Sequence, residues 1–410
     1  MSISVNQYIA KRIINTVGSN GIPPEYGFQF FTAGLEPYLS IIDEEYLSTY
    51  IKQGGSTFKM VVGAYGGGKT HFLYSIRDLA WRHNFVVSYV TLSPKDNPFY
   101  QLDSVYKAIV KGMLPPLTPD DLLSGFEKGI VSFIRSWFSS KYKEFTEKGF
   151  SGDELEDLLL NSLDGIMGIE SLSFDKAVKT AFRALLCKEE EKFIDICQWL
   201  TGDGYDRRIH GNFGILQRID KTTAFTLIRS LVQWIRQIGF SGLVILLDEA
   251  ERQASLNSKQ RELHLNNLRE IIDECGHTAF KSVMIFYAVP DENFLEGRTQ
   301  VYEALKQRLA TIFDELNPTG VKIELERLSL NPYEFLTQVG KKLEEIYKIA
   351  YSCKFDQNKS DEIISTIADL SYEQRFGDIG YKRVFVQYLI KGLHYLREKE
   401  AIPSSEYFII

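Results

Sequence analysis

Two short stretches of the sequence combine residue types that can bind and cleave a polyphosphate. The first fits the pattern G-x-x-x-x-G-K-[ST] between Gly63 and Thr70. Its glycines let the backbone curl with its N–H groups facing an anion, and the helix that follows adds its positive N-terminal end. Lys69 is placed to reach the β- and γ-phosphates of a nucleotide, and the Thr70 hydroxyl is placed to meet Mg²⁺. The predicted nucleotide-binding residues of this loop are Gly63, Ala64, Tyr65, Gly66, Gly67, Gly68, Lys69, Thr70 and His71.

The second stretch consists of five aliphatic residues, 243–247, followed by Asp248 and Glu249. Such a run predicts a buried central strand whose carboxylates emerge at its C-terminal edge, where ligands sit in an open α/β sheet. There Asp248 can hold Mg²⁺ through its water shell, and Glu249 can orient and polarise an attacking water. The alternative is an acidic strand end that only meets solvent. We favour the catalytic interpretation because the phosphate loop is also present.

A parallel sheet is required to position both stretches at one edge. The sequence predicts five strands, at 58–62, 85–92, 243–249, 283–289 and 321–325. In ATPases with this layout, the strand beside the acidic one carries a polar group that senses the γ-phosphate. Here that place is filled by Tyr287, Ala288 and Val289, without an Asn or Thr. The sequence therefore assigns no sensing residue to this strand, and Asp291, just beyond it, is only a weak substitute.

Helical patterns occupy most of the remaining chain and define five regions. The first region is an N-terminal helical linker region, residues 1–56. An ATPase core is predicted in two parts, 57–100 and 206–330, which are separated by a helical insertion, 101–205. The last region is a C-terminal helical lid, 331–410. Helices are expected over 35–53, 70–84 and 301–315 among others. Asn331 is a strong helix start because a proline follows it and a glutamate lies three residues on.

Aromatic and basic residues outside the loop each allow two interpretations. Tyr26 and Phe28 can lie against an adenine ring or seal the core, and packing is the favoured role. Arg308 can reach the γ-phosphate of a neighbouring subunit in a ring, or form an ion pair on the flank of the sheet. Lys382 and Arg383 begin the last long helix, where a positive group can touch the phosphates or remain solvated.

The composition indicates a globular protein and argues against several kinds of binding partner. Of 410 residues, 44% are hydrophobic and 25% charged, as in ordinary globular proteins. The formal net charge of -7 argues against autonomous binding to nucleic acid or to an acidic membrane. The four cysteines form no C-x-x-C pair, which argues against a zinc site and a disulfide framework. Without a long apolar run or a signal-peptide pattern, we expect a cytoplasmic protein with no membrane partner.

These motifs together resemble the additional-strand (ASCE) group of P-loop NTPases, and within it the AAA+ ATPases related to origin-recognition and STAND-like signalling ATPases. The implied fold class is α/β, an AAA+ (ASCE) P-loop core with a five-stranded parallel sheet, a helical insertion and a C-terminal helical lid. A narrower resemblance is to the ATP-binding proteins of BREX bacteriophage-defence loci. The runs that carry it are 21–24, 30–36, 62–73, 88–94, 242–249, 288–292 and 302–309.

The resemblance implies ATP and Mg²⁺ as cofactors, with metal contacts at Thr70 and Asp248. It also implies that Glu249 and Lys69 are catalytic, and it places Arg383 near the lid arginine of the family, although Lys382 replaces the proline that usually precedes it. The implied partners are other defence-system proteins, with indirect DNA association and a homo-oligomeric ring.

The preferred function is an ATP-hydrolysing switch or motor in anti-phage defence. One alternative is a nucleotide-gated scaffold with little or no turnover, motivated by the apolar strand 283–289. The other is an origin-recognition-like DNA loader, which the acidic net charge disfavours.

Overall fold

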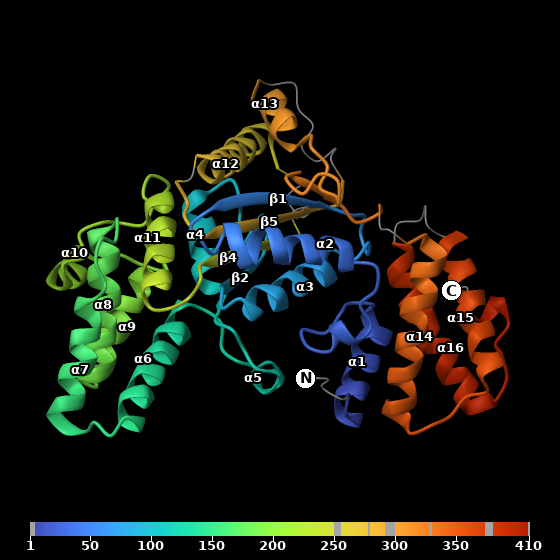
Figure 1. Ribbon diagram of the computed structural model, residues 1–410. Helices are drawn as coiled ribbons and strands as arrows, with labels where there is room; N and C mark the ends of the chain where they lie inside the picture. The colour runs from blue at the N-terminus through green and yellow to red at the C-terminus, as the bar shows by residue number, and fades with distance from the viewer. Residues whose placement is uncertain are drawn as a thin grey trace.

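The computed structural model describes residues 5–249, 256–277, 279–291, 300–327, 330–373 and 380–408. Over these residues the chain is a mixed α/β protein in which helices flank a central sheet and two helical groups extend from its opposite ends (Figure 1). The six strands lie in the order β3-β2-β4-β5-β1-β6. Their bounds are β1 Ser56–Val62, β2 Val86–Thr91, β3 Met113–Leu114, β4 Leu243–Asp248, β5 Val283–Val289 and β6 Lys322–Glu324.

The sheet differs from the predicted five-stranded parallel sheet by one short strand. The five predicted strands are present and pair in parallel, but β3 pairs antiparallel with β2. β3 has only two residues, too few to show an alternating pattern, and Pro115 and Pro116 follow it directly. The sequence therefore indicated only a break between helices here, and the prediction of a five-stranded, wholly parallel sheet is wrong at this edge.

Alternate residues of the central strands pack into two different cores. In β5, Ile285 and Tyr287 join the cluster that includes helix α12 (Ser258–Gly276), whereas Met284 and Phe286 join the cluster that includes helix α3 (Lys69–Arg82). All seven residues of β5 are buried. Burial on both faces explains why these strands appear in the sequence as continuous apolar runs. In β4, Leu246 lies on the α3 side, so Asp248, two residues later, faces the same side.

The N-terminal region and the later core contain two departures from the predicted helices. The predicted helix over 35–53 is divided into α2 (Glu36–Ile41) and a π-helix, η2 (Ile42–Tyr50). The predicted helix over 301–315 is shorter, since α13 covers Gln300–Leu309. Short 3-10 helices occur at η1 (Phe28–Phe30), η3 (Gly211–Phe213) and η6 (Ser405–Tyr407).

The segment between β2 and β4 is mainly helical and shares its core with the sheet. Trp234 of α11 packs against Phe133 and Trp137 of α6 with ring centroids 5.5 and 5.6 Å apart. These rings belong to the same apolar cluster as Ile245 and Ile285 of the sheet. The helices are α4 Leu102–Lys111, α5 Pro119–Ser124, α6 Ile130–Glu147, α7 Gly152–Asp164, α8 Leu172–Leu186, α9 Glu190–Leu200, α10 Arg207–His210 and α11 Ala224–Gln237.

The last three long helices, α14 (Pro332–Tyr351), α15 (Gln357–Glu373) and α16 (Tyr381–Lys399), form a core of their own with the N-terminal helix α1 (Gln7–Asn20). Figure 1 shows α1 beside α14, although they lie at opposite ends of the sequence. Asn331 caps α14 as predicted, because its side chain accepts a hydrogen bond from the backbone N–H of Glu334 at 2.9 Å.

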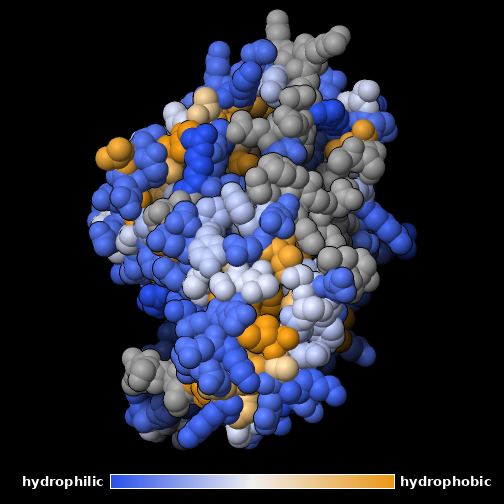
Figure 2. Space-filling model, turned by 90° about the vertical axis from the view of Figure 1, so that its right-hand side faces the viewer, coloured by the Kyte–Doolittle hydropathy of each residue, from blue (hydrophilic) through white to orange (hydrophobic). Residues whose placement is uncertain are grey.

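The outer face of these helices is largely polar. Figure 2 shows this side of the molecule, where hydrophilic residues cover most of the surface and hydrophobic ones form small areas between them. Within the described ranges, none of the helices has the length and apolar character needed to cross a bilayer.

Candidate nucleotide-binding site

The glycine-rich loop joins the C-terminal end of β1 to the first turn of α3, as the sequence predicts. Gly66 and Gly68 have φ angles of 75° and 101°, in the left-handed region that favours glycine. The backbone N–H of Gly67 donates to the carbonyl of Ala64 at 2.8 Å, which closes the loop into a tight turn. The N-terminal end of the 14-residue helix α3 therefore lies directly behind this turn.

Lys69 folds back over the loop that precedes it. Its Nζ donates to the carbonyl oxygens of Gly63 at 2.8 Å and Ala64 at 3.2 Å, and the side chain is buried. The ammonium group therefore lies against the same turn that a bound phosphate would contact.

Asp248 contacts Thr70 in the first turn of α3, although the two residues lie 178 positions apart in the sequence. The hydroxyl of Thr70 donates to Asp248 Oδ2 at 2.8 Å, and the hydroxyl of Tyr89 on β2 donates to the same oxygen at 2.5 Å. The other carboxylate oxygen, Oδ1, accepts from the backbone N–H of Glu249 at 2.9 Å. The two stretches that the sequence analysis identified are thus in direct contact. Burial and the neighbouring Asp248 carboxylate raise the pKa of Tyr89 far above its ordinary value, so its hydroxyl keeps its proton.

Glu249 follows β4 in an unusual backbone conformation. Its φ angle is 59°, in the left-handed region that few non-glycine residues adopt. A conformation of this kind can cost about 1–3 kcal/mol. Five other described non-glycine residues share it, among them the helix caps Ser352 and Glu400. β4 ends at Asp248, and Glu249 lies in the wall of the cavity that also includes Lys69, Thr70 and Asp248.

Lys69, Thr70, Asp248 and Glu249 line one cavity at the C-terminal edge of β1, β2 and β4. Its volume is about 1260 Å³ including the open mouth. Cationic and anionic side chains both line it. Its charged residues are Glu25, Lys69, Lys128, Asp248, Glu249 and Arg383. Lys128 and Glu25 form an ion pair of 2.8 Å at the wall of this cavity, and neither residue carried a motif that sequence reasoning could recognise.

His71 belongs to the wall of the cavity and is uncharged. Its Nε2 lies 2.7 Å from the hydroxyl of Thr32, and its ring makes edge contacts with Phe28 and Phe31. Burial, together with the nearby charge of Lys382, lowers the pKa of His71 to about 4. A neutral, packed imidazole supports the shape of the loop and adds no positive charge to it.

The first turn of α16 packs directly on the glycine-rich loop. Lys382 is buried, and its Nζ donates to the carbonyls of Gly67 at 3.1 Å and Leu325 at 3.2 Å. Burial lowers its pKa, and Glu326 partly opposes this effect. The Arg383 guanidinium donates to the carbonyl of Asn20 at 2.7 Å and lies 5.2 Å from the centre of the Tyr65 ring. The C-terminal helices thus contact the loop through both basic residues that the sequence singled out.

A second, mostly apolar cavity of about 720 Å³ adjoins the first. The two share the chain segment Gly21 to Pro23, Gly66, Gly68, His71 and Arg383. Its remaining wall includes Phe31, Leu325, Phe335, Val339 and Phe385. Tyr26 and Phe28 line neither cavity and are buried in packing contacts, which favours the packing role expected for them.

A family model described as the BREX system ATP-binding protein BrxC/D matches residues 5–408. The chain belongs to this family. The description names ATP as the ligand of the family and BREX defence as its setting. The resemblance that the loop and strand motifs carry is therefore confirmed over nearly the whole chain. The search of curated proteins gave no match, and neither did the search of solved structures.

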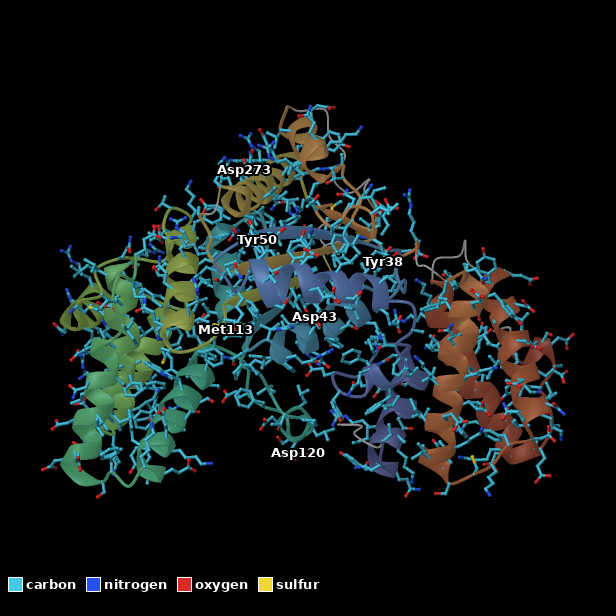
Figure 3. The ribbon with its side chains drawn as sticks, in the orientation of Figure 1. Tyr38, Asp43, Tyr50, Met113, Asp120 and Asp273 are labelled. Carbon is cyan, nitrogen blue, oxygen red and sulfur yellow. The ribbon has the colours of Figure 1, made fainter. Side chains whose placement is uncertain are left out.

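In this BREX family member, Arg308 lies apart from the cavity. Its guanidinium donates to both carboxylate oxygens of Asp273 on α12, at 2.7 and 3.3 Å. Figure 3 shows Asp273 near the top of the view, on the helix that packs against the face of the sheet opposite α3. Arg308 is therefore not brought together with Lys69, Asp248 and Glu249 within one chain.

Strand β5, which lies between β4 and β1, presents no polar side chain to the cavity. Tyr287 of β5 turns to the other face, where its hydroxyl lies 2.8 Å from His264 Nε2 and its ring packs on Phe99. Ala288 and Val289 are fully buried. Asp291 is exposed just beyond the strand, and the run 288–292 ends at Glu292, which lies outside the described residues.

Proposed function

We propose that the chain is an AAA+-type P-loop ATPase that acts as a nucleotide-driven switch or motor in BREX defence. The observation that carries the proposal is the 2.8 Å hydrogen bond between Thr70 and Asp248, because it unites the phosphate loop with the acidic strand end. The placement of β4 and β5 between β2 and β1, with the loop leaving β1, supports a P-loop core of the additional-strand type.

The two adjoining cavities bind different parts of the nucleotide. The charged cavity takes the triphosphate, which the backbone N–H groups of the loop and the α3 N-terminus bind while Lys69 neutralises its charge. The apolar cavity takes the adenine base, between the segment Gly21 to Pro23 and the C-terminal helices. Lys382 and Arg383 connect the bound nucleotide to these helices, which act as the lid, residues 331–410.

The donor set fits Mg²⁺. This ion prefers hard oxygen ligands and is usually held by one or two carboxylates together with substrate phosphates. Asp248 and the Thr70 hydroxyl supply such oxygens in adjacent positions. In the part of the chain that the structure describes, no group of three or more His, Cys, Asp or Glu side chains forms an all-protein metal cage. When bound, the ion would neutralise charge on the transferred phosphoryl group.

Phosphoryl transfer to water depends mainly on positioning and on electrostatic stabilisation. Glu249 orients and polarises the attacking water, and Lys69 stabilises charge on the γ-phosphate. Arg308 acts on a neighbouring subunit only if a ring forms and the Asp273 ion pair opens. Both side chains of this pair are partly exposed, and an exposed ion pair contributes only about 0–1 kcal/mol to stability. The pair can therefore open at little cost.

The direct test of hydrolysis is phosphate release by purified protein with Glu249→Gln. We expect turnover to fall at least 100-fold while ATP binding persists, because only the activation of water is removed. Glu144→Gln is the matched carboxylate-to-amide control, because Glu144 lies on α6, pairs with Lys141 and Lys148, and lines neither cavity. Unchanged turnover in Glu249→Gln would refute the catalytic role of Glu249.

A second function has a specific observation in its favour. The burial of Tyr287 on the opposite face leaves β5 without a group that can sense the γ-phosphate. A nucleotide-gated scaffold with little or no turnover would need no such group. Protein that retains nucleotide but releases no phosphate, with or without DNA, would support the scaffold. Other defence proteins are the proposed partners, with any DNA association indirect.

A further inference from the structure

Tyr89 is a cavity residue to which neither the motifs nor the family description assigns a role. It lies on β2, whose register pairs Thr91 with Asp248 of β4. Side chains alternate along a strand, so Tyr89, two residues before Thr91, lies on the same face of β2 as Thr91. Tyr89 therefore lies on the same face of the sheet as Asp248. Its hydroxyl consequently reaches Asp248 Oδ2 at 2.5 Å.

Three donors together fix the orientation of the Asp248 carboxylate. Thr70 and Tyr89 donate to Oδ2, and the backbone N–H of Glu249 donates to Oδ1. The Thr70 hydroxyl keeps its lone pairs for a metal while it donates its proton. The Tyr89 hydroxyl also interacts with the Thr70 hydroxyl, and it donates its proton to Asp248, so it supports both oxygen groups proposed for the metal.

The ring of Tyr89 is held in place independently of this hydrogen bond. It packs against Tyr74 of α3 with ring centroids 5.3 Å apart, and its backbone belongs to the parallel pairing of β2 with β4. A phenylalanine at this position keeps the ring contact and loses only the donor. The hydroxyl can therefore be removed without emptying the space between the strand and the helix.

We infer that Tyr89 is a positioning residue, which holds Asp248 in the orientation needed to bind Mg²⁺ beside the triphosphate. The inference rests on the proposed function, because it concerns the metal of the same site. Groups that orient a metal ligand typically change metal affinity by about 10–100-fold when they are removed. The effect should therefore appear in the Mg²⁺ dependence of nucleotide binding.

The test compares wild type with Tyr89→Phe, using a fluorescent ATP analogue. Binding is measured with EDTA and across a Mg²⁺ titration. We expect the Mg²⁺ concentration at half-maximal enhancement to rise about 10-fold or more in Tyr89→Phe, with metal-free affinity within about twofold of wild type. Tyr106→Phe is the matched control, because Tyr106 is a buried tyrosine of α4 whose hydroxyl donates to the Leu200 carbonyl at 3.0 Å.

Each other outcome overturns the inference in a distinguishable way. If wild type shows Mg²⁺-dependent binding and Tyr89→Phe shows the same midpoint, the positioning role alone is wrong. An equal loss of metal-free binding would mean that the hydroxyl shapes the cavity and does not act through Asp248. Absence of nucleotide binding in the wild type would overturn the proposed function and this inference together.

Discussion

The contact between α16 and the glycine-rich loop can be tested by adding one carbon atom. A Cβ at Gly380 would lie 2.1 Å from the carbonyl oxygen of Tyr65 and 3.0 Å from the carbonyl carbon of Gly66. Since carbon–oxygen contacts are normally about 3.3 Å or longer, α16 or the loop must move by about 1 Å. A shift of this size exceeds the tolerance of the hydrogen bonds from Lys382 to Gly67 and Leu325, now 3.1 and 3.2 Å long.

Gly380→Ala should therefore lower both stability and nucleotide affinity. Hydrogen bonds of charged groups contribute about 1.5–3 kcal/mol each, so weakening the two made by Lys382 should cost about 2–4 kcal/mol. We expect a lower melting temperature and ATP binding weakened about 10-fold or more by isothermal titration calorimetry. Gly211→Ala is the control, because its Cβ would meet no atom within 4 Å. Wild-type melting and binding in Gly380→Ala would refute the packing of α16 on the loop.

Two further predictions concern stability away from the cavity. Burial lowers the pKa of Lys59 from 10.5 in the unfolded chain to about 7 in the folded protein. Between these two pH values the unfolded state binds more protons than the folded state. The free energy of unfolding should therefore rise as the pH rises from about 7 to 10.5. Lys59→Met should remove this rise, up to about 1.4 kcal/mol per pH unit in denaturant unfolding; equal slopes in both proteins would contradict it. Asn331→Ala should cost about 1 kcal/mol because it removes the α14 cap, whereas Asn331→Ser should retain most of it. Identical urea midpoints for all three proteins would show that this cap does not contribute.

The parts of the site that are local in sequence could be predicted from sequence. The loop and the acidic strand end each carry their chemistry within a few consecutive residues, so Lys69, Thr70 and Asp248 were recognisable by type and spacing. Strands β4 and β5 were recognisable because burial on both faces makes them almost continuously apolar, whereas β6 was recognisable by its alternation of polar and apolar residues. Asn331 was recognisable because capping residues have a characteristic order.

The parts that depend on register or on distant partners could not be predicted. Tyr89 reaches Asp248 only because β2 pairs with β4 in one register, and a tyrosine in an alternating strand otherwise indicates nothing but packing. The Lys128–Glu25 pair joins residues about 100 positions apart without a motif. The Arg308–Asp273 pair likewise depends on how α12 and α13 pack. β3 was missed because two residues carry no periodicity.

The central claim is that Lys69 and Asp248 act on the same bound triphosphate, and the most direct measurement is ATP titration calorimetry with and without Mg²⁺. We predict that wild type binds ATP more tightly with Mg²⁺, that Lys69→Ala weakens binding in both conditions, and that Asp248→Asn abolishes only the gain from Mg²⁺. A wild-type protein that takes up no ATP, or an Asp248→Asn variant with the full Mg²⁺ gain, would contradict the account.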